Sequence, residues 1–489
     1  MKQNGSYFFQ SFAAILLAAI CFLGFKEVLP KRIFVETTVP TKNVVVDSFL
    51  LESVAQEKEE VKTMPVVDTF YRKKIVFEKM DGIVYPPENY EEYKGFQYLI
   101  PYFEKLYQLE TQKDGDVRIA YFGDSMTDGD LIVQDFRYAM QAQFGGQGVG
   151  FVSITSESAK SRSSISHQYS SNWKTQSYLN VKRPANPFGV NGHVFFANDT
   201  ISTTWVQYKA GYGKFTNQLN NPTLFYGKSA NENAELIVKI GNDTLFKKLN
   251  GEKSLNVLPI SNSNLKSFKA SFKEADSIPI YGFNFDDGKG VHIDNFSNRG
   301  NSGLPITTFS TSMMRQFQER LDYDLIILHY GTNVLNYGTY NYDWYEKSMT
   351  KVVNHLKECF PGVTILVISS ADKATKYELE MKTDSAVVPL TNAQRKYAVQ
   401  SKAGYFNLYK AMGGEGSMAL WAEEDPPLAN KDYTHFNYKG AQKVAGLLFE
   451  QLQTGYAQYK RMRTNRVIVP KKTSTDSVKT KNLPVDEKP

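Results

Sequence analysis

Short continuous apolar runs alternate with amphipathic stretches in two separate parts of the chain. Runs at residues 117–122, 325–329 and 363–369 have the length and character of strands buried in a parallel sheet. The helical patterns between and after them cover residues 131–144, 344–359, 392–402 and 441–452, and another begins near residue 96. This alternation predicts an α/β domain built on a parallel sheet.

The middle of the chain has a different pattern. From about residue 190 to residue 295, short alternating strands follow one another at a spacing of about ten residues, with turn signals such as Gly241-Asn242-Asp243. Such spacing is typical of an all-β sandwich, and Ser-rich residues 151–185 lead into it. Because α/β strands lie on both sides, we predict a sandwich over 151–295 that is inserted into the α/β domain.

The N-terminal region predicts a membrane anchor followed by a linker. Residues 7–25 are apolar and uncharged, and nineteen residues just span a bilayer core of about 30 Å. A signal peptide is the alternative, but no small-x-small cleavage site follows. We therefore predict an uncleaved anchor within residues 1–30 and a juxtamembrane linker over 31–94. Lysines flank the apolar run on both sides, so the positive-inside rule leaves its orientation open.

Charge and cysteine content exclude several classes of protein. The net charge is +6, and residues 456–489 carry nine Lys or Arg against three Asp or Glu, so residues 1–455 sum to zero. We predict a basic disordered tail over 456–489, and a body without the basic patch that nucleic-acid binding requires. Two cysteines exclude a disulfide framework, and six scattered histidines form no metal-ligand cluster. No metal or cofactor is therefore expected.

Candidate chemistry begins where the first predicted strand ends. The sequence GDSMTDG, residues 123–129, places Ser125 between a parallel strand and a helix, where α/β folds hold ligands. Free N–H groups at a helix start would stabilise a developing oxyanion. The alternative is that Ser125 only caps the helix, since serine is an ordinary N-cap residue.

A serine nucleophile needs a base and a group that orients the base. The sequence DYTHFNYKG, residues 432–440, places Asp432 three residues before His435 in a predicted loop ahead of the last helix. A carboxylate at that spacing can accept a hydrogen bond from the imidazole and fix its tautomer. The DxxH pattern alone is common by chance.

Together these motifs resemble the first and last sequence blocks of the SGNH (GDSL-type) hydrolase family. Two intermediate blocks have counterparts in the right order, at residues 298–303 (NRGNSG) and at residues 331–333 (GTN). The resemblance implies a flavodoxin-like three-layer α/β fold, split into residues 95–150 and 296–455 around the inserted sandwich. One departure is Val334, where the family often has an acidic residue.

The resemblance also implies a role for each matching residue. Ser125 is the nucleophile, His435 the base and Asp432 its orienting carboxylate. The oxyanion hole consists of the N–H of Ser125, the N–H of Gly303 and the side-chain amide of Asn333.

Peptidoglycan O-acetylesterases of this family carry a similar inserted β-sandwich. The segment at residues 411–418, AMGGEGSM, is similar to the region before their last block. This resemblance implies a membrane-anchored esterase that removes O-acetyl groups from a cell-envelope polysaccharide, with peptidoglycan as the first guess. The body would then face the periplasm or the cell exterior from the cytoplasmic (inner) membrane.

Two other functions remain open at this stage. An O-acetyltransferase on the same scaffold would pass the acyl group to a glycan hydroxyl, and an anchored body would suit a membrane acyltransferase as its partner. A non-catalytic envelope protein would use the insert to bind glycan. Aromatic residues of the insert are candidates either for stacking on sugars or for its core: Tyr208, Tyr212, Phe225 and Tyr226.

Overall fold

In the computed structural model, the three apolar runs become neighbours in one parallel sheet of five strands. The strand order is β15–β3–β16–β17–β20. The second of these strands along the chain, β15, is therefore an edge strand beside the first, β3. The strands are β3 (Asp116–Gly123), β15 (Gly290–Asn295), β16 (Tyr323–His329), β17 (Thr364–Ile368) and β20 (Gly404–Phe406). This 2-1-3-4-5 order is that of flavodoxin-like folds, which bind ligands where the order reverses, beside β3 and β16.

Helices pack on the sheet in two groups. The helices α3, α4 and α10 contact one another, and α6 contacts both α5 and α7. The connection that contains α4 runs across the sheet from β3 toward β15, whereas those that contain α5 and α6 run in the other direction. Because such crossovers are right-handed, α4 lies on the opposite face of the sheet from α5 and α6. The bounds are α3 (Ile100–Gln112), α4 (Val133–Phe144), α5 (Thr311–Leu321), α6 (Asp343–Cys359), α7 (Val387–Gln400) and α10 (Tyr438–Thr464). The α/β organisation predicted from the apolar runs is therefore confirmed.

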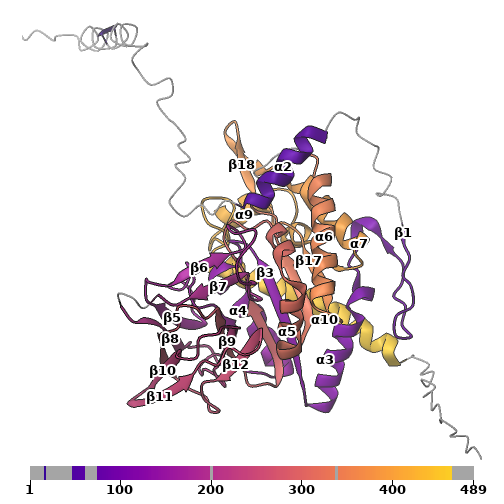
Figure 1. Ribbon diagram of the computed structural model, residues 1–489. Coiled ribbons are helices and arrows are strands. Elements are labelled where there is room, and N and C mark those ends of the chain that lie inside the picture. The colour runs from indigo at the N-terminus through magenta and orange to yellow at the C-terminus, as the bar shows by residue number, and fades with distance from the viewer. Residues whose placement is uncertain (1–15, 18–46, 61–73, 199–201, 336–339, 465–489) are drawn as a thin grey trace, which may run out of the picture. The chain divides into compact units, whose positions relative to one another are not determined.

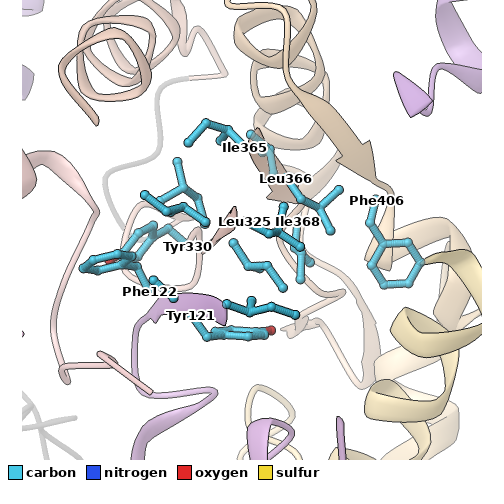
Figure 2. Close-up of a cluster of buried hydrophobic side chains, with 14 of the residues drawn as sticks. Tyr121, Phe122, Leu325, Tyr330, Ile365, Leu366, Ile368 and Phe406 are labelled. Atoms are coloured by element: carbon cyan, nitrogen blue, oxygen red, sulfur yellow. The ribbon is translucent and has the colours of Figure 1, made fainter. Parts of the chain in front are cut away.

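The main core lies around the parallel strands. Figure 2 shows part of it, with Tyr121 and Phe122 of β3 beside side chains from β16, β17 and β20. Every residue of β17 is buried, and β16 is buried at all but one position. Burial on both faces is the reason these strands are continuous apolar runs in the sequence.

The insert is a sandwich of two antiparallel sheets, seen beside the parallel sheet in Figure 1. One sheet has the order β11–β10–β13–β8–β5, and the other has the order β12–β9–β14–β7–β6 with β4 paired to β14. The strands are β4 (Gly150–Val152), β5 (Ile165–Tyr169), β6 (Lys174–Ser177), β7 (His193–Phe196), β8 (Thr204–Ala210), β9 (Thr223–Gly227), β10 (Glu235–Ile240), β11 (Asp243–Lys248), β12 (Leu255–Pro259), β13 (Ser267–Lys273) and β14 (Ile280–Phe285).

The boundary predicted at residue 295 is wrong, because β15 belongs to the parallel sheet. The sequence pattern did not predict β15 as a buried strand because it contains buried polar residues. Asp294 is fully buried and forms a bidentate pair with Arg118 of β3, at 2.8 and 3.0 Å. Most of the aromatic candidates of the insert are core residues, since Tyr208, Phe225 and Tyr226 are buried, whereas Tyr212 is exposed.

The structure differs from the linker predicted over residues 31–94. Segments β1 (Lys74–Ile75), β2 (Glu88–Asn89) and the short helices η2 (Tyr90–Glu92) and η3 (Phe96–Leu99) lie against the α/β domain. Tyr85 and Tyr93 are buried, and the Tyr93 hydroxyl donates to the Ala403 carbonyl at 2.7 Å. Buried aromatic side chains hold this segment in place, and its backbone is irregular. Its sequence therefore lacks the regular spacing of apolar residues from which helices and strands are predicted.

The tail predicted over 456–489 begins too early, because α10 continues to Thr464. Tyr456 and Tyr459 are buried, and the Arg463 Nε donates to Glu104 of α3 at 2.8 Å. Part of the basic character assigned to the tail therefore belongs to a helix of the folded domain. The rest of the predicted tail, residues 465–489, lies outside the described residues.

The structure describes residues 16–17, 47–60, 74–198, 202–335 and 340–464. The chain divides into two compact units, residues 1–44 and 45–489, and every element above belongs to the second. Along the described parts, no helix combines the length and apolar character needed to cross a membrane. The anchor predicted over 7–25 lies outside the described residues except for Leu16 and Leu17.

Candidate active site

Ser125 lies just beyond the carboxyl end of β3, half-buried, in a tight turn. A side chain at Gly123 would place its Cβ 2.2 Å from the Thr127 hydroxyl oxygen, so glycine is required there. The buried Asp124 carboxylate accepts from the Met126 N–H at 2.9 Å, and burial raises the pKa of this carboxyl to about 6. These contacts hold the turn that presents Ser125.

The structure differs from the expectation that Ser125 opens a helix. A short 3₁₀ segment at Asp128–Asp130 follows the turn, and α4 begins only at Val133. The N-terminus of α4 is therefore not the oxyanion donor, because helix-terminus effects fall off within the first turn.

The structure brings the three predicted catalytic residues together. The Ser125 Oγ lies 3.0 Å from His435 Nε2, and His435 Nδ1 lies 2.8 Å from Asp432 Oδ2. The other oxygen of Asp432 accepts from the backbone N–H groups of Thr434 and His435, each at 3.0 Å. Partial burial opposes the charge of Asp432, but the hydrogen bonds from His435 and Thr434 hold its pKa below the ordinary value. An anionic Asp432 favours the proton on Nδ1 and leaves Nε2 to accept from Ser125.

The candidate catalytic side chains are open to solvent on one side. The side chains of His435 and Asp432 are 38% and 49% exposed, respectively. An ester attached to a large polymer can therefore approach Ser125 without entering a deep tunnel.

The loop after β15 is hydrogen-bonded to the turn that carries Ser125. The Asn298 N–H donates to the Gly123 carbonyl at 3.1 Å, and the Asn295 amide donates to the Thr127 carbonyl at 2.9 Å. The Arg299 Nε also donates to the Asp128 carboxylate at 2.5 Å. This arrangement explains how residues 298–303, which lie far from Ser125 in sequence, come to flank it.

The predicted oxyanion donors differ in availability. The Asn333 amide donates to the Asn301 carbonyl at 3.0 Å, which uses one of its two N–H bonds and leaves the other. The Gly303 N–H is already engaged with the Asn301 side-chain oxygen at 2.9 Å, and Gly303 is buried against the Tyr330 ring. In the structure as it stands, Gly303 therefore does not offer the free N–H that its predicted role needs.

Gly300, in the same loop as Gly303, has a backbone N–H that is not engaged within the described parts of the chain. Its backbone has φ +76°, which favours glycine. It lies three residues before Gly303.

Replacing Asn333 with alanine is expected to lower kcat for a small acetyl ester by about 10²–10³, the usual cost of losing one oxyanion donor. KM should change little, because the contact strengthens in the transition state. Steady-state kinetics with 4-nitrophenyl acetate measures both, and thermal unfolding checks that the variant is folded. A kcat within a few-fold of wild type would remove Asn333 from the oxyanion hole.

Asp47, in the predicted linker, also contacts this region. One carboxylate oxygen accepts from the N–H groups of Phe49 and Leu50, at 3.0 and 3.1 Å, and so caps α2 (Ser48–Glu60). The other accepts from the Ser302 N–H at 2.9 Å and from the Ser302 hydroxyl. Asp47 is buried and ties α2 to the loop next to Gly303. An aspartate just before an apolar helix start was the available sequence signal.

Replacing Asp47 with alanine is expected to lower the free energy of unfolding by about 1–3 kcal/mol, because buried donors lose their acceptor. Urea denaturation measures this change. A matched control is Glu52→Ala on the same helix, whose side chain is 62% exposed and for which a change within about 0.5 kcal/mol is expected. Equal effects of the two substitutions would show that the Asp47 contacts do not stabilise the fold.

Two of the other buried histidines, His329 and His167, are held by hydrogen bonds inside the fold. Burial lowers the pKa of both His329 and His167 to about 4, and each ring is hydrogen-bonded, to the Tyr121 hydroxyl and the Ile154 carbonyl respectively. Within the residues that the structure describes, no group of three or more His, Cys, Asp or Glu side chains could hold a metal ion.

A polar cavity of about 340 Å³ lies between the catalytic loops and the insert. The serine and glycine loops contribute Asp128, Ser297 and Arg299, and the insert contributes Ser156, Ser177 and His193. Hydroxyl, amide and guanidinium groups dominate this lining, which suits a polyhydroxylated ligand better than an acyl chain.

Comparison with known proteins supports the same class of chemistry. Residues 283–443 match the model of the GDSL-like Lipase/Acylhydrolase family. This range includes Asn333, Asp432 and His435, whereas Ser125 precedes the insert and lies outside it. No curated protein sequence matches the chain. Residues 283–443 are thus similar to a GDSL-like hydrolase domain, and the series from Ser125 through His435 to Asp432 has the geometry of a serine-hydrolase triad.

Solved structures support the fold. A peptidoglycan O-acetylesterase is similar with a TM-score of 0.60 and 22% identity, over 73% of this chain and 96% of that one. A family two carbohydrate esterase from Cellvibrio japonicus has a TM-score of 0.26 and 10% identity, over 60% of this chain and 98% of that one. The first shows that the arrangement of the α/β domain and its insert has a counterpart. The second is too distant to support an argument.

Proposed function

We propose that this chain is a serine esterase that removes O-acetyl groups from a cell-envelope polysaccharide, with peptidoglycan as the first candidate substrate. The observation that carries the proposal is the hydrogen-bonded series from Ser125 through His435 to Asp432, which is open to solvent. A polar cavity lined by Asp128 and Arg299 lies next to the loops around Ser125, although the three triad residues do not line it. The similar fold of a peptidoglycan O-acetylesterase supports the choice of substrate.

Acylation begins with the Ser125 hydroxyl. Its oxygen attacks the acetyl carbonyl while His435 Nε2 takes the proton, and Asp432 stabilises the resulting imidazolium. Negative charge on the carbonyl oxygen is met by the N–H of Ser125, the free N–H of the Asn333 amide and an N–H of the glycine loop. The carbon–oxygen bond to the sugar then breaks, and His435 gives its proton to the departing sugar oxygen, which leaves as a hydroxyl.

Deacylation repeats these steps with water. His435 removes a proton from a water molecule, whose oxygen attacks the acetyl carbonyl on Ser125. The tetrahedral intermediate collapses, the Ser125 oxygen regains a proton from His435, and acetate leaves. The chain's own residues supply every proton transfer.

The location of the site supports a polymeric substrate. The acetyl group is small and the triad is open, so most of the substrate would lie outside the catalytic turn. The adjoining cavity, with its hydroxyl and amide groups, would receive the sugar that bears the ester or its neighbour. We further propose that residues 7–25 anchor the protein in the cytoplasmic membrane with this domain outside.

The test is release of acetate from purified O-acetylated peptidoglycan. Wild-type protein is expected to release acetate in proportion to the ester content, and none from the same material after mild alkaline removal of its esters. If the protein hydrolysed 4-nitrophenyl acetate but released no acetate from the acetylated peptidoglycan, peptidoglycan would be eliminated as the substrate. The assignment as an esterase would remain.

Transfer to a glycan hydroxyl is the alternative fate of the same acyl-enzyme, because the open site admits either water or a sugar hydroxyl. Adding a de-O-acetylated glycan acceptor distinguishes them. Hydrolysis predicts that acetate accounts for all ester lost, whereas transfer predicts new O-acetyl groups on the acceptor.

A further inference from the structure

Tyr178 belongs to the insert, but its side chain packs in the core of the α/β domain. It directly follows β6, and its N–H donates to the Gly192 carbonyl at 2.9 Å within the insert. The ring is fully buried and stacks on Phe309, with ring centres 5.7 Å apart and planes inclined by 7°. A side chain at Gly192 would place its Cβ 2.6 Å from the other side of the Tyr178 ring. Contacts from both domains therefore fix the position of this ring.

The Tyr178 hydroxyl meets the glycine loop. Its oxygen accepts from the side-chain amides of Asn301 at 2.8 Å and Asn298 at 3.2 Å. Because the Asn301 side-chain oxygen already accepts from the Gly303 N–H, the nitrogen of that amide is the atom that faces Tyr178. The two asparagines are the first and fourth residues of the turn that contains Gly300, and the Asn301 N–H donates to the Asn298 carbonyl at 3.4 Å. One hydroxyl thus joins both ends of the turn that carries the free Gly300 N–H.

Asn301 also connects Tyr178 to the other candidate oxyanion donor. Asn301 is fully buried, and its carbonyl accepts from the Asn333 amide at 3.0 Å. The same residue therefore contacts Tyr178 through its side chain and Asn333 through its backbone. A displacement of Asn301 would move the Asn333 amide and the Gly300 turn together.

Other contacts of the loop do not replace the Tyr178 hydroxyl. The second partner of the Asn301 amide nitrogen is the Tyr330 hydroxyl, at 3.4 Å, which is a long and weak hydrogen bond. The Ser302 carbonyl accepts from the Tyr345 hydroxyl at 2.9 Å, so the α/β domain holds the loop just beyond Asn301. Loss of the Tyr178 hydroxyl would therefore loosen the Gly300 turn while the rest of the loop stays attached.

The position of these donors matters because an oxyanion hole works by preorganisation. A donor stabilises the transition state when it lies about 2.7–3.1 Å from the place where negative charge develops. A misplacement of about 1 Å can cost about a hundredfold in rate, even when the change that causes it is remote. The contacts between Ser125, His435 and Asp432 do not pass through this loop, so the proton transfers would be unaffected.

We propose that Tyr178 is a positioning residue for the oxyanion hole. Through Asn298 and Asn301, its hydroxyl holds the Gly300 turn and the Asn333 amide where they receive the carbonyl oxygen of the ester. The insert thereby contributes to the rate of the chemical step, independently of any ligand that it holds. This inference rests on the proposed esterase function.

The test is Tyr178→Phe in the full chain, which removes one oxygen atom and keeps the ring. We expect kcat for 4-nitrophenyl acetate to fall about tenfold, less than the 10²–10³ for losing a donor outright, with little change in KM. The pH dependence of kcat/KM should keep its wild-type midpoint, because the contacts of His435 are unchanged. Thermal unfolding shows at which temperatures the variant is fully folded, and the kinetics are measured there.

The matched control is Tyr226→Phe. Tyr226 is another buried tyrosine of the insert, and its hydroxyl donates to the Asn250 carbonyl at 3.0 Å, within the sandwich. The control removes the same atom from the same domain, so kcat should stay within about twofold of wild type, the level expected for a site that does not contact the catalytic loops.

A double-mutant cycle with Asn333→Ala separates positioning from a general structural effect. If Tyr178 acts through the Asn333 amide, Tyr178→Phe should cost about threefold or less in the Asn333→Ala background, instead of about tenfold. A loss that only reflected a weaker fold would be the same in both backgrounds.

The outcomes that overturn the inference differ from those that overturn the proposed function. Wild-type kcat in Tyr178→Phe, an equal loss in Tyr226→Phe, or a full additive loss in the Asn333→Ala background would each remove Tyr178 from this role and leave the esterase. Hydrolysis that did not depend on Ser125 would overturn the proposed function, and this inference with it.

Discussion

Replacing Ser125 with alanine is expected to lower kcat for 4-nitrophenyl acetate by about a million-fold, to a residual rate set by binding and the oxyanion donors. The reason is that Ser125 Oγ is the atom that forms the bond to the acyl group, and its hydrogen bond to His435 Nε2 at 3.0 Å is the route for its proton. Steady-state hydrolysis measures the loss, and a fluorophosphonate probe should label wild type but not the variant.

The matched control for that substitution is Ser263→Ala, at an exposed serine in a turn of the insert. It should retain wild-type kcat and probe labelling. A Ser125→Ala protein that kept more than about one hundredth of the wild-type rate would mean that another group is the nucleophile, and the family resemblance would then concern the fold alone.

Replacing Asp432 with asparagine is expected to lower kcat by about 10⁴, although the geometry is almost unchanged. An asparagine amide facing His435 Nδ1 would donate a hydrogen bond to it, so the imidazole proton would move to Nε2. The imidazole could then no longer accept the proton of Ser125. Steady-state kinetics at neutral pH measures the effect.

The control for the charge change is Glu415→Gln, an exposed carboxylate in the segment before the catalytic loop. Its kcat should match wild type. If Asp432→Asn lost no more activity than Glu415→Gln, the hydrogen bond of 2.8 Å between Asp432 and His435 would have no catalytic role, and a different group would orient the base.

The parallel sheet was predictable because strands buried on both faces must be continuously apolar. The runs at β16 and β17 met that condition closely, and the run at β3 met it except at Arg118. Another strand of this sheet, β15, did not, because the Arg118–Asp294 ion pair places a carboxylate inside the sheet. A buried charge whose partner lies 176 residues away in sequence leaves no local signal.

The members of the candidate triad could be picked out from short motifs, whereas the residues that contact and support the site could not. Ser125 lies in the motif GDSMTDG, and Asp432 and His435 lie in the motif DYTHFNYKG. Each motif contains the residue types that the proposed reaction requires. Whether the Gly303 N–H is free depends on the Asn301 side chain, to which it donates a hydrogen bond, and only the fold of the loop reveals that contact. Asp47 acts through Ser302, at a separation of 255 residues, so its contact also emerges only in three dimensions.

Rapid quenching during turnover of O-acetylated peptidoglycan tests the central claim most directly. The protein is digested after the quench, and the peptide that contains Ser125 is examined by mass spectrometry. A peptide heavier by one acetyl group, located on Ser125 and absent from the Ser125→Ala protein, is the predicted result. Acetate release with no acetyl adduct on Ser125, even under conditions that slow deacylation, would contradict an acyl-enzyme at this serine.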